Sequence, residues 1–187
     1  MKKTTDKSRD KIGIIGLGYV GVPFFIGFSK KKLNVIGYDK DLYKIKNLKS
    51  GKNYLPHLKN SDFSILKSKK STTNISDLKD CTTIIICLPT PIKGKKNKPD
   101  LSHINNFFDE FKKIIRKHMS VILVSTVYSG FTREIISEKI KSLGFIVGRD
   151  IFLSFSPERE NPGDKDFALS NTPRLLAGYT KKCSIQA

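Results

Sequence analysis

The sequence contains no tryptophan and only three cysteines, three histidines and two methionines. Cys81, Cys87 and Cys183 are odd in number and show no C-x-x-C or Cys/His ligand spacing. Neither a disulfide framework nor a zinc site is therefore predicted. The longest apolar runs are too short to cross a bilayer, and the charged start lacks the apolar region of a signal peptide. We expect a cytoplasmic protein with no membrane partner.

Acidic residues are also scarce. Asp and Glu number 17 against 35 Lys and Arg, so the formal net charge is +18 and nucleic-acid binding is an alternative to consider. Only six of the basic residues are arginines, and the lysines are spread along the chain without the interleaved arginines and aromatic residues of a recognition surface. We expect no nucleic-acid partner, although the positive field would attract an anionic nucleotide.

The length and composition are those of one globular domain. A chain of 187 residues, 38% hydrophobic and 28% charged, can bury a sizeable core. Residues 1–10 are polar and are expected to form a flexible leader. We assign residues 11–187 to a single folded domain.

The stretch with the clearest chemistry opens this domain. Residues 11–15 are short, apolar and β-branched, as expected for a buried parallel strand. Gly16, Gly18 and Gly21 follow in the spacing G-x-G-x-x-G. Between a strand and a helix, these glycines permit a tight turn, the approach of a pyrophosphate and close packing of the helix. The free N–H groups at the helix start attract phosphate, so the spacing predicts a dinucleotide site.

An acidic residue at the end of the next strand supports this prediction. Residues 34–38 have strand character and lead to Asp39, 18 positions beyond Gly21 (39 − 21), where a ribose-binding carboxylate is expected. A carboxylate accepts hydrogen bonds from the ribose hydroxyls of NAD and repels the 2′-phosphate of NADP, although Lys40 weakens this exclusion. We therefore expect NAD. The alternative is a turn of the same type that holds another nucleotide or none.

The rest of the chain alternates between strands and helices. This alternation, with short connections, implies an α/β fold with a Rossmann-type, doubly wound parallel sheet and helices on both faces. Residues 52–80 are the least regular part, with one short amphipathic segment at 62–66. Strands are expected at residues 82–88, 121–125 and 151–154, and helices at 41–50, 101–117 and 132–142.

Ligands bind at the carboxyl ends of strands in such sheets, which makes two polar residues candidates for cofactor contacts. Thr90 lies between two prolines directly after the strand at 82–88. Lys44 lies in the helix that follows Asp39 and can reach a cofactor phosphate or ribose. The alternatives are an ordinary turn at Thr90 and a solvated lysine at position 44.

A second polar group follows the strand at 151–154. Glu158, Arg159 and Glu160 place three ionisable side chains at this strand end. A glutamate there is a candidate general base, and the arginine can pair with a phosphate or carboxylate. The alternative is a solvated charged turn.

The histidines are not candidates for a metal site. His57, His103 and His118 have no carboxylate or cysteine at a spacing that would make a metal site, and we expect them at the surface.

Taken together, these segments resemble the UDP-glucose/GDP-mannose dehydrogenase family, most of all its UDP-N-acetylglucosamine 6-dehydrogenase branch. The resemblance covers nearly the whole chain from Lys11. FSPERENPG is the most specific motif, because the glucose branch has an N-P-E-F-L type sequence at this place. The other motifs that carry the resemblance are IGIIGLGYVGVP, GYDKDLYKIKNLKSG, ICLPTPIKGKKNKPDLSHI and VSTVYSGFT.

The resemblance implies a two-step oxidation of the C6 alcohol of a UDP-sugar to a carboxylate, with two NAD molecules used in turn. Thr126 would lie near the reacting water, and Glu158 would be the acid/base glutamate. Glu158, Arg159 and Glu160 would line the sugar-nucleotide site. The residues implied to contact NAD are Gly16, Gly18, Tyr19, Val20, Gly21, Asp39, Lys44, Pro89, Thr90 and Thr126.

The sequence departs from the family's pattern in two respects. Ser129 replaces a proline, and Phe131 a small residue or threonine, in the turn after Thr126. In the family the chain continues through a long central helix to a second domain, which carries the nucleophilic cysteine in a G-G-H-C-type motif. This sequence contains neither, and its own three cysteines match no family motif.

We therefore expect the NAD-binding half of a UDP-N-acetylhexosamine 6-dehydrogenase, truncated before the central helix and C-terminal domain. NAD binding should survive in this chain, whereas complete oxidation needs a nucleophilic cysteine from a complementing half. Exposed apolar surface would favour a homodimer. The alternatives are a non-catalytic NAD-binding module and a fragment of a UDP-glucose, UDP-N-acetylmannosamine or GDP-mannose dehydrogenase.

Overall fold

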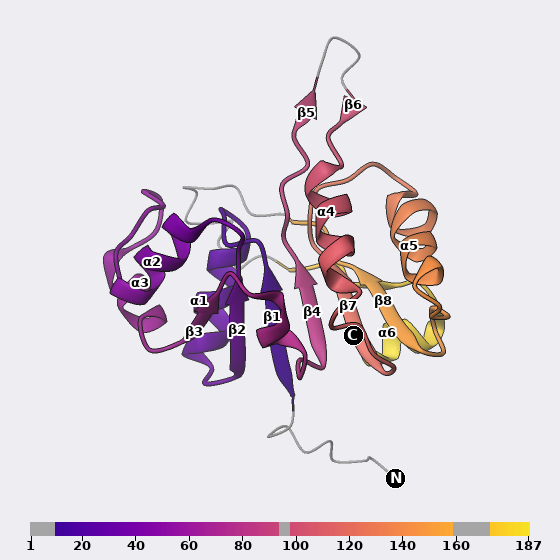
Figure 1. The fold of residues 1–187 in the computed structure, drawn as a ribbon, viewed down its shortest axis with the longest axis horizontal. Helices are drawn as coiled ribbons and strands as arrows, with labels where there is room; N and C mark the ends of the chain where they lie inside the picture. The colour runs from indigo at the N-terminus through magenta and orange to yellow at the C-terminus, as the bar shows by residue number, and fades with distance from the viewer. Residues whose placement is uncertain (1–9, 94–97, 159–172) are drawn as a thin grey trace.

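The computed structural model describes residues 10–93, 98–158 and 173–187. Its centre is a seven-stranded sheet in the order β3-β2-β1-β4-β7-β8-β9, parallel except for the β8–β9 pair (Figure 1). The chain order reverses between β1 and β4, which is the switch point of a doubly wound sheet. The predicted Rossmann-type sheet is thus confirmed. The strands are β1 Lys11–Ile15, β2 Asn34–Tyr38, β3 Lys70–Thr72, β4 Thr83–Ile86, β7 Met119–Leu123, β8 Ile151–Phe155 and β9 Ala177–Gly178.

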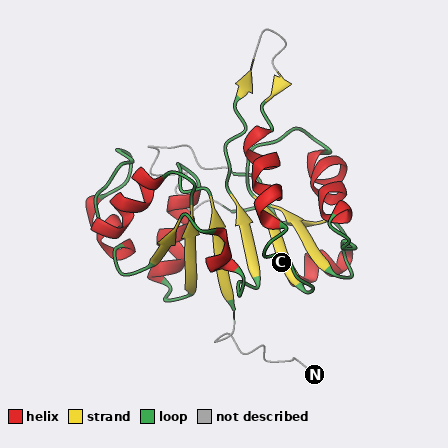
Figure 2. Cartoon of the chain, viewed as in Figure 1, coloured by secondary structure: helices red, strands yellow, loops and turns green. Residues whose placement is uncertain are grey.

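Helices cover both faces of the sheet (Figure 2). A separate short antiparallel pair, β5 (Ile92–Lys93) and β6 (Lys98–Pro99), projects beyond the strand ends in the connection from β4. The helical elements are α1 Gly21–Lys30, α2 Leu42–Ser50, α3 Asn60–Leu66, the 3-10 turn η1 Ile75–Leu78, α4 Ser102–Phe111, the π-type turn η2 Thr132–Ile136, α5 Ser137–Ser142 and α6 Lys181–Gln186.

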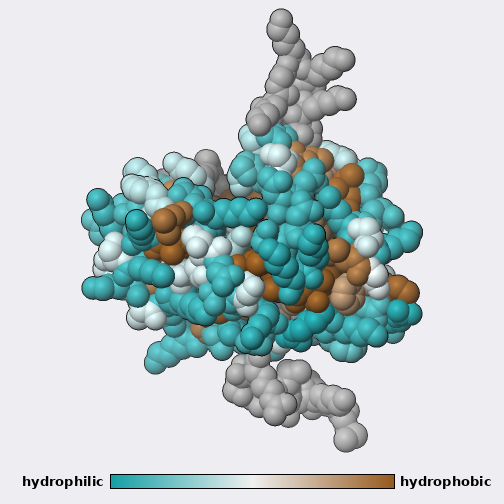
Figure 3. Space-filling view, in the orientation of Figure 1, coloured by the Kyte–Doolittle hydropathy of each residue, from teal (hydrophilic) through white to brown (hydrophobic). Residues whose placement is uncertain are grey.

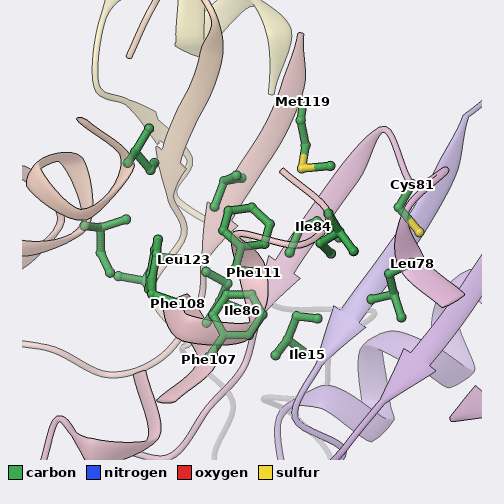
Figure 4. Close-up of a cluster of buried hydrophobic side chains, with 14 of the residues drawn as sticks. Ile15, Leu78, Cys81, Ile84, Ile86, Phe107, Phe108, Phe111, Met119 and Leu123 are labelled. Carbon is green, nitrogen blue, oxygen red and sulfur yellow. The ribbon is translucent and has the colours of Figure 1, made fainter. Parts of the chain in front are cut away.

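Isoleucines on the central strands build a separate core on each face, because successive strand residues point to opposite sides. Ile14 packs with residues of α1, α2 and α3, whereas Ile15 packs with residues of η1, α4, η2 and α5. In β4, Ile85 joins the first core and its neighbours Ile84 and Ile86 join the second. Figure 4 shows the second core, where phenylalanines of α4 lie against the strand residues.

Local sequence explains where α2 begins and ends and where α4 begins. Asp41 caps α2 by accepting a hydrogen bond from the backbone N–H of Tyr43 (2.8 Å), and Gly51 ends the helix in a left-handed conformation (φ 74°). Ahead of α4, Asp100 accepts from the backbone N–H of Ser102 (2.9 Å).

Three elements differ from the sequence-based expectation. The helix expected at 101–117 ends at Phe111, because the next residues form turns with i→i−3 bonds such as Ile114 N–H to Phe111 O (3.0 Å). The irregular stretch 52–80 contains an unpredicted strand, β3, which pairs with the end of β2 through only three residues. The helix at 132–142 begins as the π-type turn η2.

The surface is largely hydrophilic on the face shown in Figure 3, with hydrophobic residues exposed in smaller areas. Near the C-terminal end, Leu175 is 63% exposed and Ile185 is 78% exposed. No helix in the described ranges is long and apolar enough to cross a membrane. The same ranges contain no group of three or more residues suited to hold a metal ion.

The turn before β8 depends on a buried acid. Asp150 is 5% exposed and accepts hydrogen bonds from the backbone N–H of Ile146 (2.9 Å) and the guanidinium of Arg149 (2.8 Å). These two donors, Arg149 first, lower the pKa of Asp150 to about 2 from 3.8. The carboxylate therefore stabilises the fold above pH 3.8, and this contribution is lost as the pH falls through about 2.

We predict that Asp150→Asn lowers the free energy of unfolding at pH 7, because the amide replaces a carboxylate that binds Arg149 and the turn. The difference from the unsubstituted chain should shrink as the pH falls from about 4 toward 2, where the acid itself becomes neutral. Urea unfolding at several pH values measures this difference. A difference that stays constant down to pH 2 would contradict the assignment.

Candidate functional site

The carboxyl ends of β1, β2, β4 and β7 surround a cavity of about 550 Å³. Because these strands are parallel, their ends lie along one edge of the sheet, the upper edge in Figure 1. Most of the residues that the sequence assigned to the cofactor line this cavity. They are Gly16, Gly18, Tyr19, Val20, Asp39, Lys44, Pro89, Thr90 and Thr126.

The three glycines of the turn after β1 have different constraints. Gly16 has φ 89°, a left-handed conformation that favours glycine. A Cβ on Gly21 would overlap the carbonyl oxygen of Gly16, so the packing of α1 against the turn requires glycine there. A Cβ on Gly18 would meet no atom within 4 Å, since this residue borders the cavity. The fold therefore needs Gly16 and Gly21, whereas only a bound ligand would need Gly18.

The backbone of the turn is suited to bind an anion. Within the described residues, the N–H groups of Gly18, Tyr19 and Val20 have no hydrogen-bond partner. Val22 N–H, in contrast, bonds to the carbonyl oxygen of Gly18 (3.1 Å) and begins the helical pattern. Unpaired N–H groups at the start of a helix are the usual ligands of a pyrophosphate, so the turn fits the dinucleotide that its sequence predicts.

Asp39, the predicted ribose ligand, is 9% exposed at the end of β2. Its Oδ2 accepts hydrogen bonds from the backbone N–H of Leu17 (2.8 Å) and from Nζ of Lys44 (2.8 Å). Its Oδ1 accepts from the backbone N–H of Asp41 (2.9 Å), which leaves acceptor capacity on Oδ1 for a hydroxyl group. The structure thus brings Asp39 and Lys44 together in the cavity wall.

The ends of β4 and β7 form the opposite side of the cavity. The hydroxyl of Thr90 donates a hydrogen bond to the backbone carbonyl oxygen of Thr126, so these two predicted residues are neighbours. Ser125 also lines the cavity and is 4% exposed. Its backbone N–H donates to the carbonyl oxygen of Ile86 (3.2 Å), which joins the two strand ends.

Glu158 follows β8 and forms a bidentate ion pair with Arg174, with N–O distances of 3.0 and 3.1 Å. The two side chains are 9% and 20% exposed, respectively. The guanidinium of Arg174 also lies over the ring of Phe24 in α1, 4.6 Å from its centroid. The other two predicted substrate residues, Arg159 and Glu160, lie outside the described residues.

The parallel pairing of β7 and β8 places this ion pair at the same edge of the sheet as the cavity. In the cavity wall, burial raises the pKa of the Cys87 thiol, the Glu158 carboxylate raises it further, and Arg174 lowers it. Burial also raises the pKa of Cys81 to about 11. Both thiols are therefore protonated at neutral pH and are poor nucleophiles.

The sequence-based predictions did not include Arg174, the partner of Glu158, or two residues of the cavity lining. Arg174 stands 16 positions after Glu158 (174 − 158), and no spacing rule links the two. His103, expected at the surface, is exposed but lines the cavity together with Asn106 of α4. A helical spacing of three residues places both on one face of α4, which is the only signal that could have found them.

Comparison with known proteins identifies the family. The profile of the UDP-glucose/GDP-mannose dehydrogenase family, NAD binding domain, matches residues 10–187. This chain belongs to the UDP-glucose/GDP-mannose dehydrogenase family. It carries the family's NAD-binding domain, and its cofactor is NAD.

Two similar members of the family are named as dehydrogenases of N-acetylated UDP-sugars. The UDP-N-acetyl-D-glucosamine 6-dehydrogenase of Pseudomonas aeruginosa is 35% identical over 173 residues, which are 91% of this chain and 40% of the relative. The UDP-N-acetyl-D-mannosamine dehydrogenase of Pyrococcus horikoshii is 29% identical over 93% of this chain and 42% of the relative. The chain thus spans about two fifths of the length of these relatives.

Solved structures of the family have the same fold. The UDP-N-acetyl-mannosamine dehydrogenase Cap5O of Staphylococcus aureus matches with a TM-score of 0.81 at 28% identity, over 93% of this chain and 43% of that chain. The GDP-mannose dehydrogenase of Pseudomonas aeruginosa, solved as a ternary complex, matches with a TM-score of 0.82 at 25% identity, over 94% of this chain and 42% of that chain.

We predict that Gly18→Ala and Gly21→Ala separate cofactor binding from folding. Gly18→Ala should leave the free energy of unfolding within about 0.5 kcal/mol, because the added methyl group meets no protein atom. It should raise the Kd for NAD by about tenfold or more, equivalent to about 1.4 kcal/mol, because the methyl group occupies cofactor space. Gly21→Ala should lose about 2 kcal/mol of stability or more, because a backbone carbonyl must move.

Urea unfolding and calorimetric titration of NAD measure the two effects. Unchanged NAD affinity in folded Gly18→Ala would show that the cofactor does not approach this glycine.

We also predict that Cys81 and Cys87 react slowly with a chromogenic disulfide reagent in the native chain at pH 8, because both are buried and have raised pKa values. A Cys183→Ala variant removes the third cysteine from the measurement. In denaturant, this variant should react at once with two equivalents of the reagent. A rapid reaction before unfolding would instead indicate an accessible, nucleophilic thiol.

Proposed function

We propose that this chain provides the NAD-binding half of a nucleotide-sugar 6-dehydrogenase that oxidises the C6 alcohol of UDP-N-acetylglucosamine to the carboxylate. The observation that carries the proposal is the position of Glu158 just after β8, because the carboxyl end of this parallel strand lies at the same edge of the sheet as the NAD cavity. A candidate base and the cofactor site thus lie at the same edge of the sheet, as removal of a proton from the C6 hydroxyl and of a hydride from C6 requires. In this proposal residues 11–187 act as one domain.

The groups of the cavity fit the parts of NAD. In our assignment, the N–H groups of the glycine turn bind the pyrophosphate, and Oδ1 of Asp39 accepts from a ribose hydroxyl. The positive charge of Lys44 reduces the repulsion between the Asp39 carboxylate and the cofactor phosphates. Thr90 and Thr126, with Pro89, hold the other end of the cofactor, which supplies the hydride acceptor when it is bound.

Glu158 is our candidate for the acid/base residue. Its carboxylate would accept the proton of the C6 hydroxyl while a hydride leaves C6 for the bound cofactor, so the alcohol becomes an aldehyde by loss of one hydride and one proton. Arg174 fixes both carboxylate oxygens through its bidentate contact. Arg159 and Glu160 would bind the sugar nucleotide, with Thr126 near the water that later attacks.

The second oxidation needs a group that this chain does not offer. An aldehyde must be trapped as a thiohemiacetal before it can lose another hydride, and water then hydrolyses the thioester. The thiols of Cys81 and Cys87 are held protonated by burial. We therefore assign the nucleophile to residues beyond this sequence, such as those in the part of the relatives that this chain does not match.

The choice of sugar rests on the motif S-P-E-R-E and on the relatives. Two UDP-N-acetyl-D-glucosamine 6-dehydrogenases are 35% and 34% identical to the chain, while five UDP-N-acetyl-D-mannosamine dehydrogenases are 28% to 32% identical. This difference supports UDP-N-acetylglucosamine. UDP-N-acetylmannosamine, UDP-glucose and GDP-mannose are the competing substrates.

The proposal predicts that NAD binds the purified chain with at least about tenfold lower Kd than NADP, because Asp39 repels a 2′-phosphate. NADH should form from UDP-N-acetylglucosamine when the complementing half of the Pseudomonas aeruginosa relative is added, and Glu158→Gln should abolish this signal while NAD affinity is unchanged. Calorimetry and NADH absorbance measure the two properties.

Three results would revise the proposal in different ways. Failure to bind NAD would refute the assignment for this chain. NAD binding without NADH at any concentration of the complementing half would favour a non-catalytic NAD-binding module. Faster NADH formation with one of the competing sugars would change the substrate alone.

A further inference from the structure

The connection between α2 and α3 is an ordered loop that reaches the glycine turn; we call residues 53–58 the brace loop. The side chain of Asn53 stabilises the loop through two internal hydrogen bonds. Its Oδ1 accepts from the backbone N–H of Leu55 (2.7 Å), and its Nδ2 donates to the carbonyl oxygen of Leu58 (2.8 Å). Leu55 is 5% exposed and belongs to the core under α1 and α3. The loop is thus fixed at its base.

The first contact of the brace loop is a hydrogen bond. The hydroxyl of Tyr54 donates to the carbonyl oxygen of Leu17, at 2.8 Å. Burial, with the nearby Asp39 and Asp41, raises the pKa of this phenol, so it stays protonated and remains a donor. Since Leu17 N–H already binds Asp39, both polar groups of this residue are held by side chains from outside the turn.

The second contact is an aromatic stack. The rings of His57 and Tyr19 lie 4.7 Å apart and only 10° from parallel. Tyr19 is 56% exposed and lines the cofactor cavity, so His57 supports the ring from the loop side. Burial lowers the pKa of His57, so the imidazole is neutral at pH 7 and the stack joins two uncharged rings.

The nitrogen atoms of His57 do not explain its position. Its Nδ1 is buried and has no hydrogen-bond partner within the described part of the chain, which is unfavourable for a polar atom. A ring whose buried nitrogen is unpaired contributes through its faces instead.

We propose that His57 and Tyr54 are positioning residues for NAD: Tyr54 holds the peptide of the glycine turn, and His57 holds the Tyr19 ring as a wall of the cofactor cavity. His57 acts through the face of its ring and through Tyr19, without touching the cofactor. A fixed wall lowers the conformational entropy that NAD binding would otherwise remove. The inference rests on NAD binding in this cavity.

Calorimetric titration of NAD into the full chain tests the proposal. His57→Ala should raise the Kd about threefold or more, the range expected for one aromatic pair. His57→Phe should restore the affinity of the unsubstituted chain, because a flat ring remains. Tyr54→Phe, which removes one hydroxyl, should raise the Kd about fivefold. His118→Asn, on an exposed residue next to β7, is the control and should change nothing.

A double-mutant cycle tests whether His57 acts through Tyr19. His57→Ala in a Tyr19→Ala background should add no further loss, because the supported ring is already absent. Urea unfolding shows which variants are folded at the titration temperature, and only the NAD affinity of folded protein is compared.

The opposing outcomes are distinct. Equal losses in His57→Phe and His57→Ala, or additive losses in the cycle, would show that the imidazole binds the cofactor itself and would overturn the positioning role. Unchanged affinity in both His57→Ala and Tyr54→Phe would overturn the proposal while NAD binding stands. Absence of NAD binding by the unsubstituted chain would refute both this proposal and the cofactor site.

Discussion

The buried carboxylate of Asp39 joins the two strand ends on which the cofactor cavity is built. It lies at the end of β2 and binds the backbone N–H of Leu17 in the turn after β1. A buried carboxylate is costly unless donors satisfy it, and Leu17, Asp41 and Lys44 do so. The residue that gives a ribose-binding site its charge therefore also fixes the distance between that site and the glycine turn. Both the position of the ribose-binding site and its negative charge therefore depend on the Asp39 side chain.

Short-range patterns predicted the parts of the fold that local chemistry determines. Apolar, β-branched runs predicted β1, β2 and β4, and the cap and glycine at the ends of α2 predicted its limits to within a residue. The alternation of strands and helices predicted a doubly wound parallel sheet with helices on both faces. For the site, strand-end position alone was sufficient to bring Gly18, Asp39 and Thr90 to one cavity.

The missed features depend on contacts between distant parts of the chain. β3 has three residues and becomes a strand only because β2 offers an edge, so its own sequence carries little signal. Glu158 pairs with Arg174, whose guanidinium lies over Phe24 of α1, and His57 stacks on Tyr19 of the glycine turn. Helix α4 ends early although its apolar spacing continues to Ile114, which is buried in turns instead. Periodicity predicts burial more directly than it predicts backbone conformation.

The pairing of β1 with both β2 and β4 has a consequence for the order of folding. β1 pairs with β2 across 23 positions (Ile12 with Val35, 35 − 12) but with β4 across 71 (Ile12 with Thr83, 83 − 12). Closing the longer loop costs more chain entropy, so the β1–α1–β2 unit can assemble before the half that begins at β4 docks onto it. The cavity needs strand ends from both halves and is complete only after this docking. A ligand that binds there therefore favours chains in which both halves have joined.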